Sequence, residues 1–154
     1  MLKRSLLSAL FCSTIAVTAI GAIACGGGQK QVEVKGNDIE MARLVGDWEG
    51  DYQGTDSGRS GSVKFSLELG RHTAEGKVFM GGETPLDVQF VQVDGGQLQG
   101  TIAPYTDPAL GVEVKTSFLG TLEGDSISGM FTTEIKAKGM VQTGKWQVTR
   151  KPAQ

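Results

Sequence analysis

The chain has 154 residues, with 15 Lys and Arg against 17 Asp and Glu, which gives a formal net charge of −2 at pH 7. This mixed, mildly acidic balance excludes the strongly basic surface that holds nucleic acid, so we expect no nucleic-acid partner. The length allows one domain with a single core. Glycine is abundant, with 23 residues, but the regular alternation of apolar residues excludes a disordered chain.

The first element in chain order is an apolar leader. Lys3 and Arg4 give a positive start, an uncharged run extends from Ser5 to Ala24, and Cys25 follows. This is the three-part layout of a secretory signal peptide. The run is also about as long as the roughly 20 residues of a membrane span. A retained transmembrane helix and a plain secretory signal are therefore the alternatives.

Residues 22–25, with the sequence Ala-Ile-Ala-Cys, resemble the lipobox of bacterial lipoproteins. The resemblance implies that residues 1–24 are removed as a signal peptide and that the Cys25 thiol receives a diacylglyceryl group. Lipid would then hold the protein to a membrane of the bacterial cell envelope. Gly26 resembles the residue that follows the cysteine in lipoproteins sorted to the outer membrane, so we expect that membrane, on its periplasmic or surface face.

Glycines and polar residues after the cysteine predict a flexible tether over residues 25–37. Residues 38–43 predict one helical turn, with Asn37 or Asp38 as its cap. Residues 38–151 form the expected domain. Since one of the two cysteines leaves with the leader and the other is acylated, we expect no disulfide.

Apolar and polar residues alternate with period two through most of this domain, which predicts β-strands. Short turns rich in glycine and aspartate separate the strands and favour antiparallel neighbours in sequence order. In the fourth strand, Val91 and Val93 break the alternation and are compatible with a β-bulge. Eight strands are expected, at residues 44–53, 61–69, 73–80, 85–93, 97–104, 112–122, 126–135 and 140–150.

The expected fold class is all-β, because no helix is long enough for the crossover that a parallel sheet needs. A meander of eight antiparallel strands with one apolar face closes on itself to remove its edges. We therefore expect a single up-and-down barrel whose interior is filled or holds one ligand. Inward glycines such as Gly76, Gly100 and Gly129 mark either close approaches and bends or space for a ligand.

Gly46 and Trp48 open the first predicted strand, and Trp146 and Arg150 lie with matching parity near the end of the last one. This arrangement resembles the signature of the lipocalin and calycin superfamily, in which a G-x-W motif packs beneath a basic side chain from the last strand. The resemblance implies a lipocalin-like barrel in which Trp48 and Arg150 have structural roles. A guanidinium over an indole face contributes about 0.5–2 kcal/mol.

Three acidic residues, Asp47, Glu49 and Asp51, share the outer face of the first predicted strand. Carboxylates of this kind could bind a cation. Side chains on one face of a strand run parallel and do not converge, so we expect cross-strand ion pairs instead, with Lys145 opposite the stripe.

No other residue forms a recognisable site. His72 has no partners for a zinc site or a catalytic triad. Ser57, Ser60 and Ser62 lie in a polar loop without the strand–turn–helix context of an activated nucleophile. We therefore expect no catalytic, metal or cofactor residue, and a protein that is not an enzyme.

The leading hypothesis is a monomeric, lipid-anchored barrel that binds a small apolar ligand inside or an envelope protein at its rim. The longest predicted loop, residues 103–111, carries Tyr105 and Leu110 and would either cap the barrel or contact a partner. The alternative is an inhibitor of a protease or lysozyme, acting through this loop or an N-terminal arm at residues 29–37. A purely structural envelope component is a third possibility.

Overall fold

The computed structural model describes residues 30–81 and 84–152. The expected signal peptide, Cys25 and the first residues of the expected tether lie outside the described residues. The elements are β1 (Val32–Lys35), α1 (Asp38–Leu44), β2 (Gly46–Gly54), β3 (Ser60–Leu67), β4 (Thr73–Met80), β5 (Thr84–Asp94), β6 (Gln97–Asp107), β7 (Val112–Glu123), β8 (Ser126–Ile135), the short 3-10 helix η1 (Lys136–Lys138) and β9 (Met140–Arg150).

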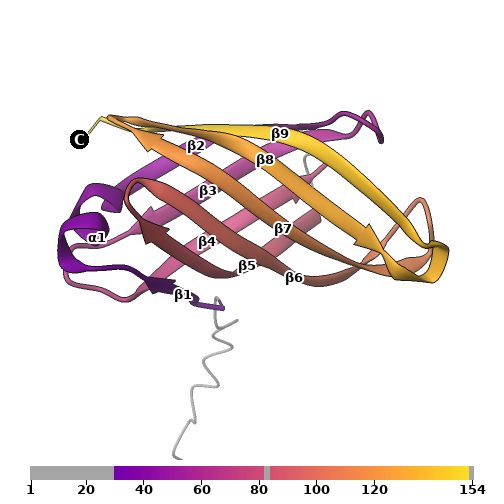
Figure 1. Cartoon of the computed structure of the whole chain (residues 1–154), viewed down its shortest axis with the longest axis horizontal. Helices are drawn as coiled ribbons and strands as arrows, with labels where there is room; N and C mark the ends of the chain where they lie inside the picture. Colours follow the sequence, from indigo (N-terminus) through magenta and orange to yellow (C-terminus); the bar gives the residue numbers. More distant parts are fainter. Residues whose placement is uncertain (1–29, 82–83, 153–154) are drawn as a thin grey trace, which may run out of the picture.

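The strands form one closed barrel in the order β1-β4-β3-β2-β9-β8-β7-β6-β5, with β4 and β5 also paired directly (Figure 1). The expected all-β fold and closed barrel are therefore confirmed. The expected strand arrangement is wrong, because the described residues form nine strands and β1 runs parallel to β5. The barrel is thus not a purely antiparallel meander of eight strands.

The additional strand, β1, fills a gap between β4 and β5. These two strands pair over Lys77–Met80 only, and beyond that point β1 lies between them, with Val32 opposite Ala74 and Val34 opposite Val91. Val32 and Val34 are 0% and 1% exposed. Residues 32–35, expected to be part of the tether, thus form a strand of the barrel, with Val32 and Val34 in its core. Their apolar–polar alternation was too short to distinguish from the polar segment around it.

Helix α1 covers one end of the barrel (Figure 1). The Asn37 side chain accepts a hydrogen bond from the Glu40 N–H at 2.9 Å, so the expected helical turn and its Asn37 cap are confirmed. Met41 and Leu44 are buried against the strands. The Glu40 carboxylate accepts from the Gly96 N–H at 3.0 Å and ties the helix to the turn between β5 and β6.

The segment expected to be the long loop, residues 103–111, is largely strand. β6 continues to Asp107, and its register against β7 shifts between Ile102 and Tyr105. Pro104 lies at this interruption of the ladder, where a residue without an N–H group is tolerated. A similar shift in β5, between residues 88 and 90, agrees with the bulge that the sequence allowed.

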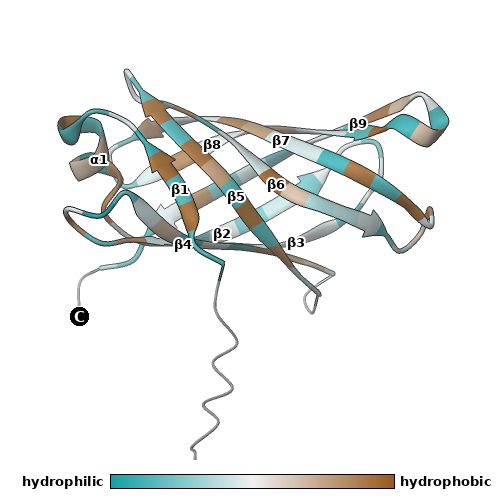
Figure 2. Ribbon diagram, turned by 90° about the horizontal axis from the view of Figure 1, so that it is seen from below, coloured by the Kyte–Doolittle hydropathy of each residue, from teal (hydrophilic) through white to brown (hydrophobic). Residues whose placement is uncertain are grey.

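Apolar and polar residues alternate along the strands, so that one face of the sheet forms the core (Figure 2). Glycines on the inner face lie against aromatic rings. A Cβ atom at Gly100 would come within 2.3 Å of the Phe118 ring, and one at Gly144 within 2.2 Å of the Phe131 ring. These glycines therefore make room for aromatic side chains of the core, rather than for a ligand.

Candidate functional site

The barrel encloses a cavity of about 100 Å³, which we call the lumen. Its lining extends from Leu44 of α1 and the nearby Trp48 to Arg59 and Met80 near the other end, so the lumen follows the barrel axis. Pockets for drug-sized ligands measure about 300–1,000 Å³, whereas an engineered cavity of about 150 Å³ holds benzene. The lumen is smaller than both, so it has room for at most one short alkyl chain or another small apolar group.

The end beside α1 is closed by Trp48 and Arg150. Trp48 is 1% exposed, and its Nε1–H donates to the Leu44 carbonyl at 2.9 Å. The Arg150 guanidinium lies 4.4 Å from the centre of the Trp48 ring and donates to the carbonyls of Val45 and Arg43. The expected contact between Trp48 and Arg150 is thus confirmed, while membership of the lipocalin superfamily stays a prediction.

The other two residues of the sequence signature have different surroundings. Gly46 has a φ of 126°, and a Cβ atom there would lie 3.3 Å from Arg150, so a side chain would disturb the closed end. Trp146 forms part of the lumen wall. Its Nε1–H donates to the Leu119 carbonyl at 3.0 Å, and its ring meets the Phe118 ring edge-on at 5.6 Å.

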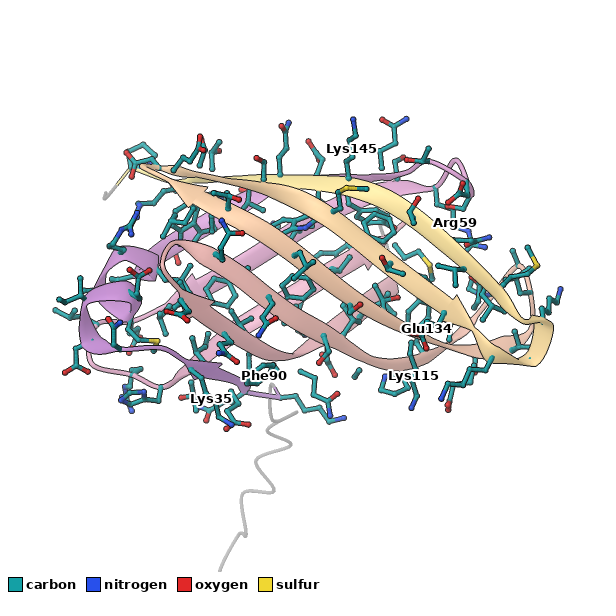
Figure 3. The ribbon with its side chains drawn as sticks, in the orientation of Figure 1. Lys35, Arg59, Phe90, Lys115, Glu134 and Lys145 are labelled. Atoms are coloured by element: carbon teal, nitrogen blue, oxygen red, sulfur yellow. The ribbon has the colours of Figure 1, made fainter. Side chains whose placement is uncertain are left out.

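The opposite end of the lumen is polar, and Arg59 lies there (Figure 3). The guanidinium of Arg59 donates to the carboxylate of Asp107, a side chain that is 1% exposed. The backbone N–H groups of Ala109 and Leu110 donate to the same carboxylate at 2.9 and 3.1 Å. Arg59 keeps 26% of its side chain exposed, so solvent reaches a side chain that borders the lumen at this end.

The electrostatic state of Asp107 follows from two opposing effects. Burial alone raises the pKa of the Asp107 carboxyl. The hydrogen bonds from Arg59 and from the two backbone N–H groups outweigh burial and hold the pKa below its usual range. Asp107 is therefore ionised at neutral pH, and the pair that it forms with Arg59 carries no net charge.

Uncharged polar side chains complete this end of the lumen. Burial raises the pKa of the hydroxyl groups of Tyr52 and Tyr105, so both stay protonated at neutral pH. The hydroxyl oxygens of Thr116 and Thr133 lie 2.8 Å apart and share a hydrogen bond. These side chains all border the lumen and offer hydrogen-bond donors and acceptors without charge.

Of the three residues of the acidic stripe, Glu49 forms the expected cross-strand ion pairs, but the expected partner is wrong. Glu49 pairs with Lys64 at 3.2 Å and also with Lys151. Lys145 lies opposite Gln53 instead, because the register between β2 and β9 places it beyond the acidic residues, and its side chain points outward (Figure 3). Over residues 30–81 and 84–152, no group of three or more His, Cys, Asp and Glu could hold a metal ion.

The remaining candidate residues have structural surroundings. His72 is exposed in a bend, and its backbone carbonyl accepts from the Val34 N–H at 2.9 Å. Ser60 and Ser62 belong to β3 rather than to a loop. Ser57 borders the lumen, and its hydroxyl accepts from the Arg59 N–H at 3.3 Å.

Sequence reasoning missed Arg59 and Asp107, the charged pair of the polar end. The two residues are 48 positions apart. Arg59 follows a turn at the end of β2, and Asp107 begins a turn at the end of β6. Alternate turns of a meander lie at the same end of a barrel, so the turns after β2 and β6 do as well. A correct boundary for β6 would therefore have predicted that Arg59 and Asp107 lie close together.

We expect Asp107→Asn to lower the free energy of unfolding by about 1.5–3 kcal/mol at neutral pH, because hydrogen bonds to a charged group are weakened. Because folding depresses the pKa, the carboxylate stabilises the fold above its unfolded pKa of about 3.9. This stabilisation is lost as the pH falls through the folded pKa. The two unfolding free energies should therefore converge in acid.

Urea unfolding of both proteins at neutral pH and at about pH 3 measures this difference. The exposed substitution Asp51→Asn is the control and should change stability by less than about 0.5 kcal/mol at neutral pH. If the difference in unfolding free energy between the wild-type protein and Asp107→Asn were the same at both pH values, the charge of Asp107 would not be what stabilises the fold.

Within the part of the chain that the structure describes, no helix has the length and apolar character needed to cross a bilayer. No protein-family model, curated protein or solved structure matches this chain. Its function therefore has to be inferred from the lumen and from the residues around Cys25.

Proposed function

We propose that this chain is a lipid-anchored protein of the bacterial cell envelope whose lipocalin-like barrel binds a small, mainly apolar ligand. The observation that carries the proposal is the lumen. Apolar side chains line most of it, α1 and the pair of Trp48 and Arg150 close one end, and the partly exposed Arg59 lies at the other. An apolar cavity with a few polar groups at one end suits a binding site, and in this proposal the ligand enters beside Arg59.

The energetics of the lumen favour a linear ligand. Burying a methylene group gains about 0.8 kcal/mol, so a chain of about six methylenes gains about 5 kcal/mol before the costs of association. Binding suits the lumen better than catalysis does. The ionised groups described at its polar end, Arg59 and Asp107, hydrogen-bond each other and leave neither free as a base or nucleophile.

The membrane anchor in this proposal rests on residues 22–25. Because β1 begins at Val32, the chain from Cys25 to the barrel can span at most about 25 Å. A lipid on Cys25 would therefore keep the barrel close to the bilayer surface. Such an arrangement suits a protein that takes up or releases a lipid-derived or other apolar molecule near a membrane.

We expect Cys25→Ser to abolish partitioning of the full chain into the detergent phase, because the acceptor of the diacylglyceryl group is lost. Phase separation of cell extracts in a temperature-sensitive detergent, with immunoblotting, measures this. Cys12→Ser is the matched control and should leave the partitioning unchanged. Recovery of the Cys25→Ser protein in the detergent phase would exclude the lipid anchor.

We expect Val78→Phe to weaken the binding of a short apolar probe, 1-chlorohexane, by about tenfold or more, because the larger ring fills part of the lumen. Titration calorimetry measures the affinity. The same substitution at Val141, which is 58% exposed, should leave it within about twofold. Equal affinities of the two variants would place the probe outside the lumen.

The inhibitor of a protease or lysozyme has less support. It would use either residues 29–37 or residues 103–111 as an inserting segment. The described part of the first segment contains β1, and residues 103–107 of the second belong to β6, so most of both is held in the barrel. What remains of the expected loop in the described part of the chain is the short turn at residues 108–111.

A further inference from the structure

The polar end of the lumen is balanced in charge. The guanidinium of Arg59 borders the lumen, and Asp107 is the single side chain of the described residues to which it donates a hydrogen bond. Asp107 lies behind it, buried and held by the N–H groups of its own turn. A ligand at this end therefore meets a neutral ion pair rather than a free positive charge.

A second cation near the lumen, Lys64, does not change this balance. Its ammonium group pairs with Glu49 at 3.2 Å and lies 6.0 Å from the centre of the Phe79 ring. Its side chain is 56% exposed. The charge of Lys64 is thus directed to the outer face of the barrel, away from the lumen.

The remaining hydrogen-bonding groups at the polar end are neutral. Tyr52 and Tyr105 each place a hydroxyl group there, and burial keeps both protonated. Gln142 contributes an amide, and Thr116 and Thr133 contribute hydroxyls, and all of them border the lumen. A head group with an uncharged oxygen can both accept and donate hydrogen bonds among such side chains.

We propose that the polar end of the lumen selects an uncharged, oxygen-bearing head group, such as the hydroxyl of a primary alcohol, on a linear aliphatic chain. It discriminates against the carboxylate of the same chain length. This inference rests on the proposed function, since it requires that the lumen holds an alkyl chain. It adds the chemical class of the ligand to that function.

The physical reason is the cost of removing a carboxylate from water. Burying an ionised group is unfavourable unless a countercharge compensates it. Here the positive charge of Arg59 is already paired with Asp107. The negative charge of Asp107 also repels that of an incoming carboxylate. A hydroxyl group loses far less hydration and recovers it through hydrogen bonds with Arg59 and the two tyrosines.

Three probes of equal chain length test the inference on the full-length wild-type protein by titration calorimetry at neutral pH: 1-hexanol, hexanoate and 1-chlorohexane. We expect 1-hexanol to bind tightest, about threefold or more tighter than 1-chlorohexane and about tenfold tighter than hexanoate. A lumen that only provides apolar contact would bind 1-chlorohexane best. That result, or a preference for hexanoate, would overturn the inference and leave the proposed function standing.

The Asp107→Asn variant gives a second test of the inference, because it removes the negative charge that balances Arg59. We expect the affinity for hexanoate to rise about tenfold and that for 1-hexanol to stay within about twofold. Glu113→Gln changes the net charge equally at an exposed position near the same end and should alter neither affinity. An unchanged preference in a folded Asp107→Asn protein would overturn the inference.

The outcomes separate the two proposals. If none of the three probes binds to the wild-type protein, the proposed function fails, and the inference fails with it. If they bind in another order, the inference alone fails. Should Asp107→Asn not fold, the order of the three probes on the wild-type protein decides.

Discussion

Replacing Trp48 by alanine should lower the free energy of unfolding by about 3–5 kcal/mol, the usual cost of truncating a buried aromatic side chain. Trp48 is 1% exposed and packs in the core cluster beside α1. The change also removes the hydrogen bond to the Leu44 carbonyl and the ring beneath Arg150. The Leu44 carbonyl and the Arg150 guanidinium thereby lose their partner, and the cavity left by the missing ring lowers the stability further.

Urea unfolding followed by circular dichroism measures this loss. Leu119→Ala is a suitable control, because Leu119 is 62% exposed on the outer face, and its truncation should cost less than about 0.5 kcal/mol. A cost below about 1 kcal/mol for Trp48→Ala would show that the indole does not lie in the core. The inward register of β2 would then be wrong as well.

Val34→Asp should destabilise the protein by about 3–5 kcal/mol, since it buries an uncompensated carboxylate between β4 and β5. Val34 is 1% exposed and lies opposite Val91 in the parallel pair. This substitution tests the correction to the expected tether. If residues 32–35 were a free linker, a charge there would have almost no effect on folding.

The matched control introduces the same residue just before the strand. Gln31 is exposed and precedes β1, so Gln31→Asp should change the free energy of unfolding by less than about 0.5 kcal/mol. Thermal unfolding of both variants beside the wild-type protein gives the comparison. Equal stability of the two variants would mean that β1 is not part of the barrel.

The strands β2 to β9 could be predicted because their signals are local. Alternation with period two fixes which side chains of a strand share a face, and glycine turns fix where a strand ends. The expected tether, residues 25–37, gave a weaker signal, since Val32 and Val34 are its only apolar pair. Whether such a pair is buried depends on a gap between β4 and β5, strands that lie some 40–60 residues farther along the chain.

The closed end of the lumen was accessible to sequence reasoning and the polar end was not. Trp48 and Arg150 form a recognisable pattern because they lie on the first and last strands of the expected meander, which close the barrel. Arg59 and Asp107 have no such pattern. The boundary of β6 was placed at residue 104, and this left Asp107 in a loop without a predicted partner.

Alternation and the order of neighbouring strands were enough to predict the all-β class and the inward faces of eight strands from the sequence. The contact of Trp48 with Arg150 was expected from the resemblance to the lipocalin signature. Tertiary structure alone decided the place of β1, the volume of the lumen and the neutral pair of Arg59 and Asp107. These features depend on how distant segments meet when the sheet closes. Such contacts are set by barrel geometry and side-chain packing, which no local pattern records.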